Sequence, residues 1–308
     1  MKLDKPLGNL FNRRPDARQF QVDHSLPMSD KYVGIEIEAE NIQIVNEDLN
    51  ILLNYWDVTT DGSLRNYGTE FVSVMLRGGD IRAALEELNN VFVNNNINPD
   101  YSERTSVHIH CDTRFLNLLQ LRTLILYYLA LEPYIFNYIG HGRENNSYCI
   151  PYYKNNSGIK RLSSLFMQNI NEADVINSIS SGAKYEAMNV RSIREKGSIE
   201  FRHHYGTNDV ETLYSWIKVV LALFRTVKQY SEADFYKFFF TRPYTVILSE
   251  ILPYFPLTHS DIDLTLCEQI ARNSISKLLI NSSSEQDILT TINKHLPKAG
   301  ISTTSGEF

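Results

Sequence analysis

Acidic and apolar residues alternate in the segment YVGIEIEAEN, residues 32–41. In a β-strand, residues two positions apart project from the same face, so Glu36, Glu38 and Glu40 would share one face and their apolar neighbours the other. An acidic face of this kind is also typical of an exposed or edge strand. The segment therefore leaves a choice between a solvated strand and carboxylates gathered for chemistry.

Three further strand-like segments carry complementary side chains at the same spacing. These are Glu70 in GTEFVSV, His108 and His110 in SVHIHCD, and Glu200, Arg202 and His204 in SIEFRHHY. If the strands are neighbours with their polar faces turned the same way, carboxylates and imidazoles line one concave surface. Carboxylates about 6 to 7 Å apart repel one another unless a cation lies between them. A set dominated by carboxylate oxygens favours Mg²⁺ or Mn²⁺ over Zn²⁺.

Arginines lie close to these segments in the sequence. Arg191, Arg194 and Arg202 fall within twelve residues of one another. A metal together with clustered arginines is typical of phosphoryl transfer, in which neutralising the spreading negative charge supplies much of the catalysis. The chain has no G-x-x-x-x-G-K-[ST] loop, so metals and arginines would have to hold the phosphates.

Strands in separated pairs, with amphipathic helices between and after them, are expected to position these side chains. The periodicity predicts helices over 78–96, 116–139 and 209–230, an extended pair within 56–76, and strands over 187–193 and 197–205 joined by a turn at REKG. This order predicts an α+β fold built on an antiparallel sheet, with a mostly helical C-terminal third. A loop over 140–160, rich in Gly, Asn, Pro and Tyr, is long enough to suggest a functional role.

Composition narrows the class of protein. The 308 residues carry a net charge of −6 without a basic stripe, so nothing indicates a nucleic-acid partner. No signal-peptide core and no uncharged apolar run of membrane-spanning length is present, and Cys111, Cys149 and Cys267 show no paired spacing. We expect a cytoplasmic protein without a membrane partner. Its expected organisation is an irregular arm over 1–31, a catalytic domain over 32–230 and a helical extension over 231–308 packed on the same domain.

Six segments taken together resemble the putative amidoligase family, in the carboxylate–amine ligase superfamily of glutamine synthetase and glutamate–cysteine ligase. They are YVGIEIEAE, TTDGSL, GTEFVS, SVHIHCD, GRENNSYCIP and KYEAMNVRSIREKGSIEFRHHYGTND, in consistent order from residue 32 to about 225. The resemblance implies an antiparallel sheet curved into a half-barrel like that of glutamine synthetase. It also implies ATP, two or three Mg²⁺ or Mn²⁺ ions, and amide-bond formation through an acyl phosphate.

The resemblance further assigns metal ligands position by position. Glu36 and Glu38 resemble the first-strand pair that serves two metal sites, Glu70 a ligand from the second strand, His108 the metal-binding histidine, and Glu200 the closing glutamate. Glutamine synthetase has two carboxylates on its second and third metal-bearing strands, whereas this sequence clearly shows only Glu70. The number of metals therefore stays open, as do the roles of Glu40 and Asp61.

Four other residues resemble those that contact the nucleotide or the reacting groups. His110 matches a histidine facing the nucleotide phosphates, Arg191 a phosphate-contacting arginine, and Arg202 an arginine that holds a carboxylate or the transferred phosphate. Arg143 matches the arginine of the family's R-x-x-N-x-Y-C loop. The predicted catalytic residues are thus Arg202, Arg191 and Arg143, with His110, Arg191 and Arg202 binding ATP.

The leading functional prediction is an ATP-dependent carboxylate–amine ligase acting on small-molecule or peptide substrates. One alternative is a phosphotransferase on the same fold, which would release a stable phosphorylated product. Another is an inactive descendant serving as a binding or structural component, for example in a phage. A zinc hydrolase built on His108 and His110 is least favoured, because further ligands of the right type are missing. The sequence names neither substrate and leaves the oligomeric state open.

Overall fold

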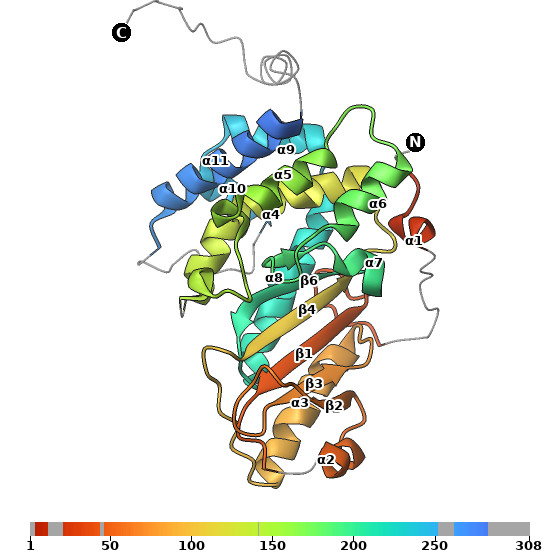
Figure 1. Ribbon diagram of the computed structural model, residues 1–308, viewed down its shortest axis with the longest axis vertical. Helices are drawn as coiled ribbons and strands as arrows, with labels where there is room; N and C mark the ends of the chain where they lie inside the picture. The colour runs from red at the N-terminus through yellow and green to blue at the C-terminus, as the bar shows by residue number, and fades with distance from the viewer. Residues whose placement is uncertain (1–3, 12–20, 44–45, 141, 252–261, 283–308) are drawn as a thin grey trace, which may run out of the picture.

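A six-stranded antiparallel sheet forms the centre of the computed structural model (Figure 1), which describes residues 4–11, 21–43, 46–140, 142–251 and 262–282. The strand order is β2-β3-β1-β4-β6-β5, and the sheet is open rather than closed into a barrel. The strands are β1 (Val33–Ala39), β2 (Trp56–Thr60), β3 (Thr69–Ser73), β4 (Ser106–Asp112), β5 (Met188–Asn189) and β6 (Ser198–Tyr205). The predicted α+β class and its antiparallel sheet are confirmed.

Helices surround the sheet and dominate the C-terminal part. The α-helices are α1 (Leu7–Leu10), α2 (Asn46–Leu52), α3 (Gly79–Asn94), α4 (Leu118–Ile139), α5 (Asn156–Ser164), α6 (Glu172–Ser180), α7 (Ser192–Lys196), α8 (Val210–Gln229), α9 (Glu232–Thr241), α10 (Tyr244–Ile251) and α11 (Leu264–Ser282). Short 3₁₀ turns, η1 (Arg143–Asn145) and η2 (Tyr152–Lys154), lie in the predicted loop. Helices α3, α4 and α8 confirm the three helices expected from periodicity.

Some of the predicted segments fall outside the described residues. Residues 1–3 and 12–20 of the expected arm belong to that part of the chain, as do residues 252–261 and 283–308 of the expected helical extension. Within the described ranges, no helix is both long and apolar enough to cross a membrane.

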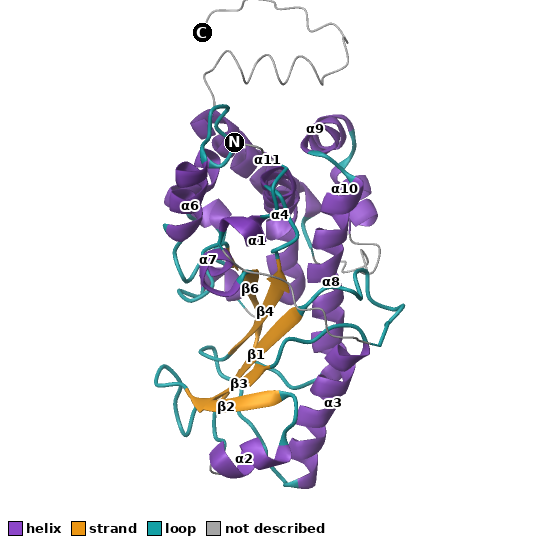
Figure 2. Cartoon of the chain, turned by 90° about the vertical axis from the view of Figure 1, so that its right-hand side faces the viewer, coloured by secondary structure: helices purple, strands orange, loops and turns teal. Residues whose placement is uncertain are grey.

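The alternation of β1 separates a core face from a polar face. Val33, Ile35, Ile37 and Ala39 are at most 1% exposed and belong to one large hydrophobic core. Figure 2 shows α3 and α8 running along one side of the sheet, and α8 contributes to the same core. The intervening glutamates therefore project from the opposite face, where none of the long helices among the described residues crosses the centre of the sheet (Figure 1).

One predicted strand is much shorter than expected and is followed by a helix. Residues 187–193 were expected to pair with 197–205 through a turn, but β5 contains two residues, with Met188 opposite Phe201 and Asn189 opposite Glu200. The chain then forms α7, which ends at Gly197 with a φ of 75°. A left-handed glycine at this position is a common helix C-terminal signal, so the segment REKG closes a helix instead of a hairpin.

The pairing of β4 with β6 contains a β-bulge. Ile109 lies opposite Phe201 and Val107 lies opposite His204, so a single residue of β4 faces two residues of β6. A bulge shifts the alternation of faces for every residue that follows it on the bulged strand.

The bulge moves His204 away from the polar face. His204 lies opposite Val107, a core residue, and its ring centroid is 6.1 Å from that of Trp216 in α8. The expectation that His204 shares a face with Glu200 and Arg202 is therefore wrong. Strict two-residue alternation fails here because the strand is not regular.

Candidate active site

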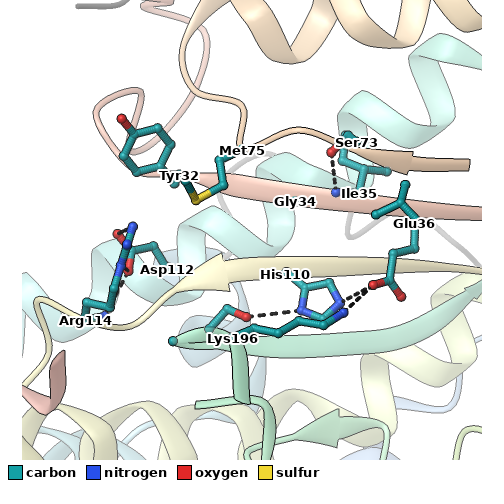
Figure 3. A pocket seen from close by; sticks show the side chains of 13 residues that line it. Tyr32, Gly34, Ile35, Glu36, Ser73, Met75, His110, Asp112, Arg114 and Lys196 are labelled. Carbon is teal, nitrogen blue, oxygen red and sulfur yellow. Dashed lines mark hydrogen bonds and ion pairs between the residues drawn. The ribbon is translucent and has the colours of Figure 1, made fainter. Parts of the chain in front are cut away.

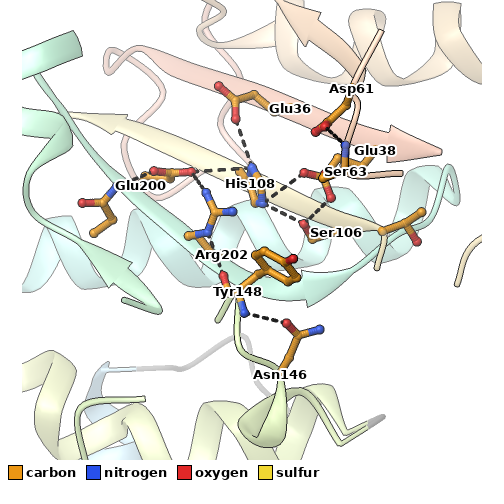
Figure 4. Close-up of polar contacts among 12 residues, drawn as sticks. Glu36, Glu38, Asp61, Ser63, Ser106, His108, Asn146, Tyr148, Glu200 and Arg202 are labelled. Atoms are coloured by element: carbon orange, nitrogen blue, oxygen red, sulfur yellow. Dashed lines mark hydrogen bonds and ion pairs between the residues drawn. The ribbon is translucent and has the colours of Figure 1, made fainter. Parts of the chain in front are cut away.

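Strand register brings the predicted ligands together. Glu36 lies opposite His108, Glu38 opposite Glu70, and His110 opposite Glu200. Directly opposed residues of an antiparallel pair have neighbouring side chains on one face of the sheet. Four strands therefore deliver their polar side chains to one patch of the uncovered face (Figure 4).

Glu36 stands at the centre of this patch. One of its carboxylate oxygens, Oε2, lies 3.0 Å from Nδ1 of His108. The other, Oε1, lies 3.1 Å from Nε2 of His110 and 2.6 Å from Nζ of Lys196. Burial alone would raise the pKa of Glu36, but the hydrogen bonds and charges of the two histidines outweigh it and hold the pKa far below its usual range.

The side of the patch toward Glu38 is more acidic. Ser106 donates its hydroxyl to Oε2 of Glu38 at 2.6 Å, and Nε2 of His108 lies 3.8 Å from the other oxygen of that carboxylate. Burial and the charge of Glu36 raise the pKa of Glu70 to about 7. The described cations thus compensate Glu36 better than they compensate its acidic neighbours.

Glu200 is fixed from two directions. The Asn189 amide donates to Oε2 at 2.7 Å, and the Arg202 guanidinium forms an ion pair with Oε1. Burial opposes ionisation, but the charges of His108, Arg202 and His110 lower the pKa of Glu200. Arg202 also donates from Nε to the carbonyl of Tyr148 at 2.9 Å, which ties the patch to the 140–160 loop (Figure 4).

The donor set fits divalent cations. Three groups each place one ligand atom per residue within 4.8 Å of one another: Glu36, Glu70 and His108; Glu36, His110 and Glu200; and Glu38, Asp61 and Glu70. Nε2 of His110 is buried and makes no well-formed hydrogen bond, although it lies 3.1 Å from Oε1 of Glu36. Carboxylate oxygens with two imidazoles suit Mg²⁺ or Mn²⁺.

Asp61 places a further carboxylate beside Glu38 and Glu70. It follows β2 directly, and its Oδ1 accepts the backbone N–H of Ser63 at 2.7 Å. Asp61 therefore shapes its turn and also reaches the group formed with Glu38 and Glu70. The TTDGSL segment made it a candidate, but only its position beside Glu70 distinguishes a ligand from a turn residue.

Two predicted arginines lie away from the patch. Arg191 is exposed and forms an ion pair with Glu195 at 2.7 Å, on the helix that carries Lys196. Arg143 is buried and donates to the backbone carbonyls of Arg202 and His203 at 2.9 and 3.1 Å. The structure thus gives Arg143 a contact with the bulge of β6 and gives Arg191 a surface pairing.

Glu40, which directly follows β1 and forms an isolated β-bridge with Asp100, is separated from the metal-type groups. It is 4% exposed, and its Oε1 accepts the backbone N–H of Arg65 at 2.8 Å. None of the three groups found among the described residues includes it. Glu40 thus has a local structural partner despite sharing a strand face with Glu36 and Glu38.

Sequence reasoning did not single out Lys196 or Asn189. Lys196 lies in the segment expected to be a turn, and Asn189 lies in the expected strand without a ligand-type spacing. Asn189 does stand opposite Glu200 in the ladder. A correct pairing of β5 with β6 would therefore have indicated Asn189, whereas Lys196 depends on the short helix α7.

Two cavities meet at the patch. The first, of about 230 Å³, lies on the His110 side and has lining residues that include Tyr32, Gly34 and Met75 (Figure 3). The second, of about 420 Å³, lies over the acidic side and is lined by polar and aromatic residues. The described residues common to both linings are Glu36 and Lys196.

Comparison with known proteins agrees with this arrangement. A family model described as "putative amidoligase enzyme" matches residues 17–224. That match covers more than half of the chain and includes all six strands of the sheet. No curated protein matches the chain. The chain therefore belongs to the putative amidoligase enzyme family, whose name denotes a ligase.

Proposed function

We propose that this protein is an ATP-dependent ligase that joins a carboxylate to an amine through an acyl phosphate. The observation that carries the proposal is the convergence of Glu36, Glu38, Glu70, His108 and Glu200 on one sheet face, between two cavities. A reaction that moves a phosphoryl group from a nucleotide to an acid needs two adjoining compartments and cations between them. The family membership of residues 17–224 supports the same class of reaction.

The three carboxylate and histidine groups would hold Mg²⁺ or Mn²⁺. Glu36 would contribute to two of the groups, and Glu38, Glu70 and Asp61 would form the third. Bound ions would neutralise the phosphate charges and orient the reacting oxygens. The chain's own part is to keep these carboxylates close together, through the strand register and through fixed partners such as Ser106 and Asn189.

The less polar cavity is the better place for the nucleotide base. Tyr32 and Met75 offer it apolar contact, and His110 lies between that cavity and Glu36, where the phosphates would lie. The polar cavity would take the acid and the amine. The rings of Tyr148 and Tyr185 belong to its lining, with centroids 5.1 Å apart.

The proposed reaction has two steps. A carboxylate oxygen of the acid attacks the γ-phosphorus of ATP, the bond to the β,γ-bridging oxygen breaks, and ADP leaves. The amine nitrogen then attacks the acyl carbon, the carbon–oxygen bond breaks, and inorganic phosphate leaves. The nitrogen loses its proton to water or to a carboxylate in the polar cavity. Arg202, which lines that cavity, would help to orient the acid.

Calorimetry with Mn²⁺ and a non-hydrolysable ATP analogue tests the proposal. The unaltered protein should bind the analogue only when the metal is present. Glu36→Gln and Glu200→Gln should each weaken this binding on the order of a hundredfold, because each removes a ligand charge. Glu40→Gln is the matched control from the same strand face and should bind normally. Metal-independent binding, or no binding by the unaltered protein, would contradict the proposal.

Product analysis tests the reaction type. Supplied with ATP and mixtures of carboxylic acids and amines, the protein should release ADP and phosphate together with an amide. Hydroxylamine in place of the amine should trap an acyl phosphate as a hydroxamate. A stable phosphorylated acceptor would instead indicate a phosphotransferase.

A further inference from the structure

Lys196 and Glu36 form an ion pair at the boundary between the two cavities. Nζ of Lys196 lies 2.6 Å from Oε1 of Glu36, and Figure 3 shows the pair in the first cavity. Both residues also line the second cavity. No other described residue is common to the two linings. A group passing from one cavity to the other would therefore pass this pair.

The two members of the pair differ in freedom. The Glu36 side chain is 11% exposed and contacts one histidine through each carboxylate oxygen, whereas the Lys196 side chain is 53% exposed. Lys196 is the last residue of α7, and Gly197 ends the helix directly after it. A long, half-exposed side chain at a helix end can reposition its ammonium group while the carboxylate stays in place.

Metal binding would compete for the same carboxylate oxygen. Oε1 of Glu36 receives both Lys196 and His110 in the described structure. A divalent ion on Glu36 provides the positive charge that Lys196 otherwise supplies. The ammonium group would then leave the carboxylate while remaining at the boundary.

The other cations near the patch do not share this position. Lys184 and Arg104 line the polar cavity alone, and Arg114 lines the other cavity alone. Arg202 is bound to Glu200 and to the carbonyl of Tyr148, and Arg191 is bound to Glu195. Lys196 thus combines a position at the boundary with a partner that a metal would displace.

We propose that Lys196 is a catalytic residue that binds the phosphoryl group as it passes from the nucleotide cavity to the acid cavity. Before the metal and the nucleotide bind, the ammonium group of Lys196 is paired with the carboxylate of Glu36. After loading, it contacts the transferred phosphate and adds one positive charge to that side of the phosphorus. This inference rests on the proposed ligase function.

The test uses the full chain, Mn²⁺ and a non-hydrolysable ATP analogue, with Lys196→Met, Lys196→Arg and the control Arg194→Met from the same helix. Lys196→Met should bind Mn²⁺ alone about threefold more tightly, because the competing ammonium is gone. It should bind the analogue at saturating Mn²⁺ at least about tenfold more weakly, because a charge-assisted contact is lost. Lys196→Arg should restore much of the analogue affinity, and Arg194→Met should match the unaltered protein in both measurements.

The opposite signs of the two effects distinguish a phosphate-binding role from a structural one. If Lys196→Met weakened both metal and analogue binding, the lysine would only maintain the site, and the inference would be wrong. Unchanged analogue affinity in Lys196→Met would overturn it equally. Failure of the unaltered protein to bind the analogue with Mn²⁺ would instead refute the ligase function itself.

Discussion

The buried carboxylates of helix α4 and of the sheet face have opposite surroundings. Glu132, in the middle of α4, is fully buried, and it accepts the hydroxyl of Tyr128 at 2.6 Å and the backbone N–H groups of Tyr152 and Tyr153 at 2.8 and 3.1 Å. The glutamates of the sheet face instead line two cavities and crowd one another. Their ligand atoms approach within 4.8 Å.

The comparison distinguishes a carboxylate whose hydrogen bonds stabilise the fold from carboxylates grouped at the spacing of metal ligands. Glu132 has a neutral donor for each oxygen and anchors η2 to α4. Glu70 lines a cavity, and burial together with the charge of the neighbouring Glu36 raises its pKa to about 7. Burial alone does not distinguish the two roles. The identity of the partners and the presence of a cavity do.

The largest expected effect comes from removing the Glu132 carboxylate, whose oxygens accept hydrogen bonds from three donors. Glu132→Ala leaves two buried backbone N–H groups and a tyrosine hydroxyl without an acceptor and creates a cavity. It should lower the free energy of unfolding by about 3 kcal/mol or more. Chemical denaturation measures this, and the exposed Glu250→Ala should stay within about 1 kcal/mol of the unaltered protein. Equal losses in the two variants would refute the anchoring role of Glu132.

Glu70→Gln tests whether the closely spaced glutamates of the sheet face bind a metal. Mn²⁺ affinity should fall on the order of a hundredfold, because a ligand charge is lost. The metal-free protein should be as stable as before or more stable, because the variant removes a charge that Glu36 repels. Calorimetry and thermal unfolding without metal check the two parts. A loss of stability comparable to that of Glu132→Ala would contradict the distinction.

The pH dependence of stability sharpens the comparison. Burial raises the pKa of Glu132 to about 7 from 4.5, so the folded state binds a proton that the unfolded state has lost. The stability contributed by this group is complete below about pH 4.5 and declines as the pH rises toward 7, by at most about 1.4 kcal/mol per pH unit. The nearby Glu186 also has its pKa raised by burial, so the difference between the unaltered protein and Glu132→Gln isolates Glu132. Identical pH profiles of denaturation would refute the assignment.

The smallest expected effect concerns Glu40. Its side chain accepts one backbone N–H, from Arg65, and the amide oxygen of Glu40→Gln can replace that contact. Stability should change by less than about 1 kcal/mol and Mn²⁺ affinity by less than about threefold. Thermal unfolding and metal titration measure both. A large loss of metal affinity in Glu40→Gln would indicate that Glu40 is a metal ligand, as proposed for Glu38.

Local pattern in the sequence predicted much of this molecule. The alternation in β1 and β4 placed Glu36, Glu38, His108 and His110 on one face, because a regular strand has a fixed two-residue period. Periodicity likewise predicted the three long helices, and Asn117 and Gln120 begin α4 with reciprocal caps. These features depend only on neighbours in the sequence.

Features that depend on pairing between distant segments were not predictable in the same way. His204 lies on the other face because β6 contains a bulge. The residue types between Glu200 and His204 do not predict that bulge. Lys196 reaches Glu36 across 160 positions of sequence. Arg143 shares a motif with the family, but its contacts became apparent only when β6 was placed beside its loop.

The bulge of β6 has a consequence for how the molecule opens. Arg143 donates to the carbonyls of Arg202 and His203, which lie at the β-bulge where the regular pairing of β6 with β4 is interrupted. The Arg143 side chain thereby connects the 140–160 loop to strand β6 of the sheet. Loosening that loop would therefore accelerate amide hydrogen exchange in β4 and β6 and free Arg202 at the same time. The loop whose length suggested a functional role would, in this way, set the rigidity of the strands that carry His108 and Glu200.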